Sequence, residues 1–176
     1  NLKGHEGWQA TSQILADRRK WAIGLGVSED EILDEMSERL KQAVKTVDVD
    51  SSAAPVQEVV FEGDDVNILD APAMMTSEKD GGRYFASGMA IVKDPETGIR
   101  NEAIIRMMLT DDPQKATFWM AARHNYAHYM KYVAMDKPMP MAFAIGLHPV
   151  YEIMSNWSGK HEDFDELEYG AGILGE

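Results

Sequence analysis

Two strand-forming runs separated by a short turn constrain the fold of this chain more than any other feature. Residues 84–93 and 99–110 are rich in aromatic, β-branched and other apolar residues, which favour strands. The segment between them, 94–98, reads Asp-Pro-Glu-Thr-Gly, with proline early and glycine late, as in a tight turn. The pattern predicts a β-hairpin.

The second strand of this hairpin carries polar residues that could bind a ligand or take part in catalysis. Alternate side chains of a strand point to opposite faces. Asn101 and Ala103 would therefore share one face, and Glu102, Ile104 and Arg106 would share the other. The amide oxygen of Asn101, a neutral ligand, and the guanidinium of Arg106, a planar cation, would then be separated by only a short length of the same strand. Taken alone, such a pair is more typical of a turn-side hydrogen bond and a surface charge.

Two helices are predicted near the start of the chain. Apolar residues at helical spacing mark the first, over 11–25, with Ser12 as its N-cap and glycines at its end. The second begins at a capping box, Ser28 to Glu31, and runs to about Lys45. Its buried face is expected to carry five apolar side chains: Ile32, Leu33, Met36, Leu40 and Val44.

Short strands and helices alternate along the rest of the chain. A small, polar stretch at 47–54 ends at Pro55 and is the best candidate for a domain boundary, which divides the chain into residues 1–54 and 55–176. Besides the hairpin, strands are predicted at 56–61, 117–120 and 141–145, and helices at 123–136, 149–156 and 164–173. Strands crossed by helices, with a hairpin, indicate an α+β or mixed α/β fold.

The composition argues against several classes of protein. No apolar run is long enough to cross a membrane, and the apolar core of a signal peptide is missing. The formal net charge is −13, with no basic stripe to offset it, which argues against binding to nucleic acid. Cysteine is absent, which excludes disulfides and thiolate metal sites and is compatible with a cytoplasmic location.

Candidate metal ligands are widely separated in the sequence. Asn101 lies in the hairpin, His124 at the predicted start of a helix, and Glu166 and Glu168 in an acidic segment. Asn, His and Glu together can bind a hard cation through mixed oxygen and nitrogen ligands. His128, one helical turn after His124, has a metal-binding spacing too, although a structural role suffices for it. An acidic segment is also typical of a solvated helix start.

Several of these segments resemble the UbiD family of decarboxylases. The motifs that carry the resemblance are Asp94–Asn101, Arg106-Met107, Gly146–Pro149 and Asp165–Glu176, and residues 55–65 and Gly81-Gly82 fit it too. The resemblance covers nearly the whole chain, in the right order and at close to the right spacings. It implies that residues 55–176 form a flavin-binding split β-barrel domain, related to flavin reductases, with flanking helices. Residues 1–54 would be the helical remainder of a preceding α/β part.

In this family a divalent ion, typically Mn²⁺, with K⁺ nearby, anchors the phosphate of prenylated FMN. The resemblance implies that Asn101, His124 and Glu166 are the metal ligands. Glu166 is preferred to Glu168 as the metal ligand because it lies earlier in the acidic segment that precedes Gly170-Ala-Gly172. The implied cofactor-binding residues are Asn101, Ala103, Ile104, Ile105, Arg106, Arg123, His124, Ser155, Asn156 and Glu166. The chain departs from the family around Trp157, where small residues and Met-Pro are more usual.

Arg106 matches the family's arginine that holds the substrate carboxylate, and it is the predicted catalytic residue. The implied activity is reversible, non-oxidative decarboxylation of an aromatic or α,β-unsaturated acid. The enzyme would be a homo-oligomer that receives its cofactor from a flavin prenyltransferase. The family takes two catalytic glutamates and a cofactor-binding lysine from beyond the position of Glu176. We therefore expect an internal piece of a longer enzyme, which does not release carbon dioxide alone.

Two other functional classes remain open. One is a flavin-reductase-like enzyme that uses ordinary FMN and needs no Asn–His–Glu metal site. The other is a non-catalytic folding or assembly domain, because the family's catalytic glutamates are not found in this stretch of sequence.

Overall fold

The computed structural model describes residues 4–11, 14–159 and 163–175 of the chain. Its helices are α1 (Arg18–Leu25), α2 (Ile32–Arg39), α3 (His124–Ala134), α4 (Pro149–Met154) and α5 (Glu166–Leu174). Its strands are β1 (Tyr84–Lys93), β2 (Arg100–Leu109), β3 (Ala116–Phe118) and β4 (Met141–Ala144). Four 3₁₀ turns, Ser51–Ala53, Pro55–Gln57, Gly63–Asp65 and Ile68–Asp70, lie between α2 and β1.

The four strands form one antiparallel sheet in the order β3-β2-β1-β4. The predicted hairpin is confirmed: Lys93 pairs with Arg100, and the ladder continues to Tyr84 and Met108. Its turn closes through the Gly98 amide, which donates to the Asp94 carbonyl at 2.9 Å. Gly98 has φ of 79°, a left-handed conformation that glycine adopts without strain.

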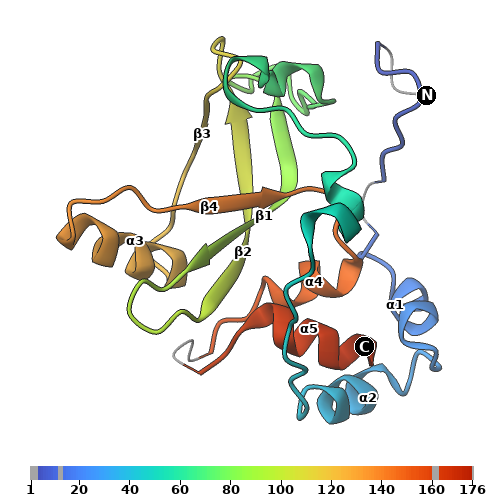
Figure 1. Cartoon of the computed structure of the whole chain (residues 1–176). Coiled ribbons are helices and arrows are strands. Elements are labelled where there is room, and N and C mark those ends of the chain that lie inside the picture. Colours follow the sequence, from blue (N-terminus) through green and yellow to red (C-terminus); the bar gives the residue numbers. More distant parts are fainter. Residues whose placement is uncertain (1–3, 12–13, 160–162, 176) are drawn as a thin grey trace.

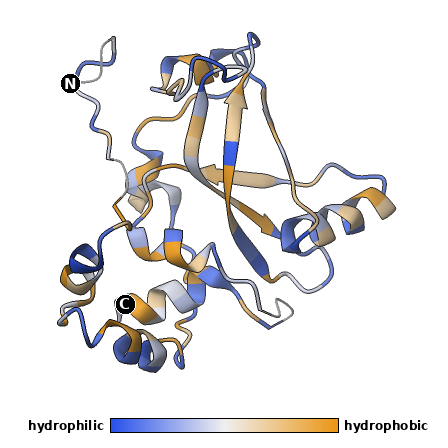
Figure 2. Cartoon of the chain, turned by 180° about the vertical axis from the view of Figure 1, so that it is seen from behind, coloured by the Kyte–Doolittle hydropathy of each residue, from blue (hydrophilic) through white to orange (hydrophobic). Residues whose placement is uncertain are grey.

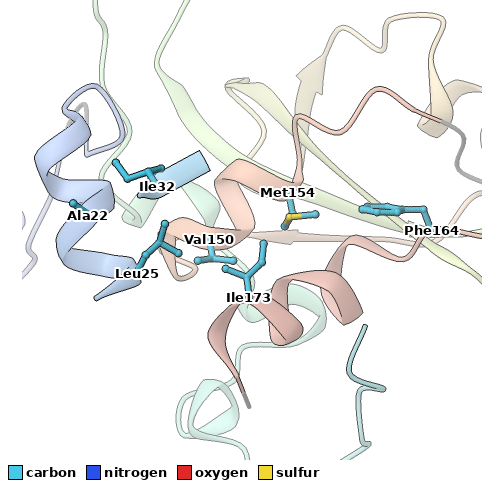
Figure 3. Close-up of a cluster of buried hydrophobic side chains, with 7 residues drawn as sticks. All are labelled: Ala22, Leu25, Ile32, Val150, Met154, Phe164 and Ile173. Carbon is cyan, nitrogen blue, oxygen red and sulfur yellow. The ribbon is translucent and has the colours of Figure 1, made fainter. Parts of the chain in front are cut away.

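The helices gather at two places around this sheet. Helix α3 packs against β1 and β2, and α5 contacts β2 from the side where α1, α2 and α4 lie (Figure 1). Helices α1, α2, α4 and α5 bury a common apolar core, shown in Figure 3. Its buried members are Ala22, Leu25, Ile32, Val150, Met154, Phe164 and Ile173. The first two helices therefore pack directly against the last two.

The α+β class is confirmed, but several local predictions are wrong. Residues 56–61 do not form a strand, because no other strand in the described ranges pairs with them. Instead, Pro55 begins a 3₁₀ turn, and Val56 and Phe61 are 82% and 67% exposed. The described strands form a sheet with β3 and β4 at its edges, and closure into a barrel is not shown.

The first two helices are shorter than predicted. Helix α1 begins after Asp17, whose carboxylate accepts from the Arg19 amide, while the predicted cap Ser12 lies outside the described residues. Helix α2 ends at Arg39 rather than Lys45, because the chain beyond it binds α5, where the Val44 amide donates to the Glu168 carbonyl at 2.9 Å. Two positions of the predicted buried face are exposed: Leu33, within α2, and Val44, beyond its end. Among the helices described, none is long and apolar enough to cross a membrane.

Candidate functional site

The start of β2 is hydrophilic, in contrast to the largely hydrophobic strands around it (Figure 2). Two of its polar side chains are nevertheless buried: Asn101 and Glu102 are each 2% exposed. Buried polar groups require hydrogen-bond partners or ions, since an unsatisfied group costs free energy. For Asn101 the partners come from the beginning of α3, and the beginning of α5 contacts the backbone of Glu102.

Asn101 faces the first residues of α3. Its Oδ1 lies 3.1 Å from Nδ1 of His124, and its Nδ2 donates to Oδ1 of Asn125. Asn125 is itself buried, and its Nδ2 donates to the carbonyl of Ala90 in β1 at 3.5 Å. The amide of Asn101 is thereby oriented, with its oxygen directed at the imidazole.

Glu166 is the first residue of α5 and is 1% exposed. Its Oε2 accepts from the backbone amide of Glu102 at 3.1 Å, immediately after Asn101. The N-cap of α5, Asp165, is fixed to the same strand because Nε of Arg100 donates to its carboxylate at 2.8 Å. These contacts place the three predicted metal ligands around the start of β2, with Asn101 and His124 in direct contact.

Three carboxylate oxygens at this place have no hydrogen-bond partner within the described part of the chain. They are Oε1 of Glu166 and both side-chain oxygens of Glu102. Burial, together with the negative charges of Glu166 and Asp165, raises the pKa of Glu102 to about 8. Burial also raises the pKa of Glu166 to about 7, against the effect of backbone amides that donate to it. A bound cation would reverse both effects.

These shifts predict that the metal-free chain becomes less stable as the pH rises. Folded Glu102 and Glu166 keep their protons up to about pH 8 and about pH 7, well above the ordinary value of 4.5. Their contribution to stability is therefore complete below about pH 4.5 and is lost as the pH passes through the folded values. Urea unfolding with a chelator present should show the free energy of unfolding falling between about pH 5 and about pH 8.

The matched variant is Glu102→Gln, which keeps the size of the side chain but cannot ionise. Its free energy of unfolding should depend less on pH across the same window. A wild-type profile that is flat or rises with pH, with chelator present, would contradict this prediction.

A cavity of about 650 Å³ opens beside this cluster. It is lined by eight of the predicted cofactor-binding residues: Asn101, Ala103, Ile104, Ile105, Arg123, His124, Ser155 and Asn156. It is also lined by residues to which the sequence analysis gave no role: Glu102, Trp119, Met120, Ala121, Ala122, Asn125 and Ser158. Trp157, which departs from the family pattern, lies in its wall too. The cavity has the size of a small-molecule or cofactor site.

Arg106, like Glu166, is not among the residues that line this cavity. It is exposed and lines a neighbouring cavity of about 930 Å³, together with several aromatic side chains: Tyr84, Phe118 and Trp119. Ile104, Ile105 and Trp119 line both cavities, so the two adjoin. Among the described residues, Arg106 thus faces a different space from Asn101 and His124.

The three predicted metal ligands, Asn101, His124 and Glu166, could supply only part of the ligand shell of a hard cation. Within the ranges that the structure describes, no three His, Cys, Asp or Glu side chains are grouped to hold a metal ion. Asn101, His124 and Glu166 supply an amide oxygen, an imidazole and a carboxylate with a free oxygen, which fit Mn²⁺ as a partial ligand shell. The remaining ligands would have to be water, backbone or a bound cofactor.

The second histidine of α3, His128, contacts the hairpin turn instead of the site around Asn101. His128 is 1% exposed, and its Nε2 lies 3.6 Å from Oδ2 of Asp94 at the hairpin turn. Lys131 also binds Asp94, at 2.6 Å. These contacts fasten α3 to the hairpin and give His128 a structural environment.

Comparison with known proteins identifies the family of this chain. Residues 47–176 match a family model, UbiD, described as the 3-octaprenyl-4-hydroxybenzoate carboxy-lyase Rift-related domain. Anhydromevalonate phosphate decarboxylase of Archaeoglobus fulgidus is 27% identical over 173 residues, which are 97% of this chain and 38% of that protein.

Solved structures show the same fold. Apo 3,4-dihydroxybenzoic acid decarboxylase (AroY) of Klebsiella pneumoniae superposes with a TM-score of 0.86 at 26% identity, over 98% of this chain and 37% of that one. The UbiD-class enzyme HmfF of Pelotomaculum thermopropionicum, in complex with prFMN, has a TM-score of 0.83 at 26% identity, over 90% and 36%. The chain thus spans less than two-fifths of the length of these relatives. Because the family model covers most of its residues, this chain belongs to the UbiD family.

Proposed function

We propose that this chain forms the cofactor-binding part of a decarboxylase that uses prenylated FMN. The observation that carries the proposal is the contact of 3.1 Å between Asn101 Oδ1 and His124 Nδ1, with the Glu166 carboxylate bound to the next backbone amide. This arrangement supports Asn101, His124 and Glu166 as the proposed ligand set. The complex of HmfF with prFMN supports the choice of cofactor.

Each group of residues has a distinct part in the proposal. Asn101, His124 and Glu166 hold Mn²⁺, with K⁺ nearby, and neutralise the cofactor phosphate. Ala103, Ile104 and Ile105 line the flavin, and three polar residues of the same cavity bind its edges: Arg123, Ser155 and Asn156. When bound, the prenylated flavin supplies the electron sink for loss of carbon dioxide.

Arg106 binds the substrate carboxylate in the adjoining cavity. Its planar guanidinium can donate two parallel hydrogen bonds to a carboxylate, which fixes the orientation of an acid substrate. Aromatic walls suit an apolar substrate body, so the proposed substrates are aromatic or α,β-unsaturated acids, with decarboxylation reversible.

The remaining parts of the proposal concern the whole protein. Residues 55–176 would complete a split β-barrel, and residues 1–54 would continue a preceding α/β part. The enzyme would act in the cytoplasm as a homo-oligomer and receive its cofactor from a flavin prenyltransferase.

The proposal predicts that Glu166→Gln weakens binding of prenylated FMN in the presence of Mn²⁺ by at least about tenfold, because metal sites lose about 10–100-fold in affinity even when only a supporting partner is removed. The measurement is a flavin fluorescence titration with and without Mn²⁺. The matched control is Glu168→Gln, the same change on the same helix, which should bind like the wild type. Binding that depends on neither Mn²⁺ nor Glu166 would contradict the proposal and favour an enzyme that uses ordinary FMN.

A further inference from the structure

We infer that Trp119 selects aromatic acids over aliphatic unsaturated acids, by stacking on a ring that is joined directly to the carboxylate held by Arg106. The inference rests on the proposed function because it takes Arg106 as the carboxylate site. It narrows the proposed substrates to aromatic acids, and it adds a specificity-determining residue that is not among the predicted site residues.

The first step is the exposure of Trp119. It is 87% exposed, the largest fraction among the exposed large hydrophobic residues of the described chain. None of the ring contacts between described residues involves Trp119, whereas Trp157 stacks on Phe164 with ring centroids 4.3 Å apart. A packed aromatic side chain buries about 150–250 Å², so an indole left in water forgoes a large stabilisation. The indole of Trp119 is therefore available to a bound ring.

The second step is the position of Trp119 beside Arg106. Strands β2 and β3 are antiparallel, and Met107 lies opposite Phe118. Extending this register by one residue past the end of β3 places Trp119 opposite Arg106. Opposite residues of an antiparallel pair share a face of the sheet, with Cβ atoms about 5 Å apart. A ligand bound by the guanidinium would therefore lie close to the indole.

The third step is the space that these two residues line. Arg106 and Trp119 both line the cavity of about 930 Å³, and Trp119 also lines the cavity of about 650 Å³. Tyr84 and Phe118 line the larger cavity too, but they are half-buried. Trp119 thus lies where the proposed substrate and cofactor spaces meet. An aromatic ring that bears the carboxylate directly can contact both side chains, whereas an aliphatic acid has no ring to stack on the indole.

The test is isothermal titration calorimetry of the purified full-length enzyme with two probe acids, benzoate and crotonate. We expect the wild type to bind benzoate about tenfold more tightly than crotonate, since stacking of two aromatic rings contributes up to about tenfold in affinity. Trp119→Ala should weaken benzoate binding by about tenfold and leave crotonate binding unchanged. Trp119→Phe keeps a ring and should retain the preference. The matched control is Trp8→Ala, the same change at an exposed tryptophan outside both cavities, which should bind both acids like the wild type.

Each outcome decides a separate claim. A wild type that binds benzoate no more tightly than crotonate overturns the inference, and so does a Trp119→Ala protein that keeps the preference. Equal weakening of both acids in Trp119→Ala would show a merely structural role and would overturn it too. If the preference depends on Trp119 but the enzyme releases carbon dioxide from no aromatic acid, the inference stands and the proposed decarboxylation fails. If carbon dioxide is released but Trp119→Ala keeps the preference, the inference alone fails.

Discussion

Replacing Arg106 by lysine in the active full-length enzyme is expected to lower the rate of decarboxylation by at least about 100-fold. Lysine keeps the positive charge but offers a point charge in place of a planar fork, so the substrate carboxylate loses its fixed orientation. A misplacement of about 1 Å at a reacting group can cost about 100-fold in rate. The effect should appear mainly in kcat, because charge attraction to the acid persists.

The structure supports this prediction through the surroundings of Arg106. The residue lies on β2, the strand that also carries Asn101, and it lines a cavity with aromatic walls. The shared wall residues Ile104 and Ile105 place this cavity next to the proposed cofactor space. A substrate held by Arg106 would therefore lie beside the flavin.

The measurement is carbon dioxide release from a panel of aromatic and unsaturated acids by the wild type and Arg106→Lys. Arg19→Lys, the same change at an exposed position of α1, is the matched control and should leave turnover unchanged. Turnover of Arg106→Lys close to that of the wild type would refute the assigned role.

The sequence predicted the elements whose signals are local. The hairpin has strand residues on both sides of a turn that its own Asp94 and Gly98 close, so no distant contact was needed to recognise it. Helix α3 begins at His124, within one residue of the predicted start at 123. The contact between Asn101 and His124 then follows from packing this helix on the hairpin.

The parts that were missed depend on contacts between distant residues. Glu102 is buried because α5 docks on β2, and the bond that joins it to Glu166 spans 64 positions. A single carboxylate in a strand gives no sign of such a partner. Helix α2 ends early for the same reason, since the following segment binds α5 through the Val44 amide and the Glu168 carbonyl. The exposed run at 56–61 has strand-forming residues, but none of the described strands pairs with it.

The segment after α2 leads to the second large effect: Gly172→Ala should destabilise the fold by about 2–3 kcal/mol or prevent folding, as overpacking in a tight core does. A Cβ atom at Gly172 would lie 1.8 Å from the backbone oxygen of Gln42 and 3.0 Å from its carbon. Backbone atoms cannot move aside as the end of a flexible side chain can. Relief would require the chain at 42–44 to separate from α5, which carries Glu166.

Urea unfolding followed by circular dichroism measures the effect, and Gly24→Ala is its matched control. Gly24 also lies in a helix, α1, but a Cβ there would meet nothing within 4 Å. Alanine should therefore stabilise the protein at Gly24 by about 0.5–1 kcal/mol through its helix propensity. Because both variants make the same change within a helix, their opposite signs would isolate the contact with Gln42. A stabilising shift in both would mean that the segment after α2 does not pack against α5.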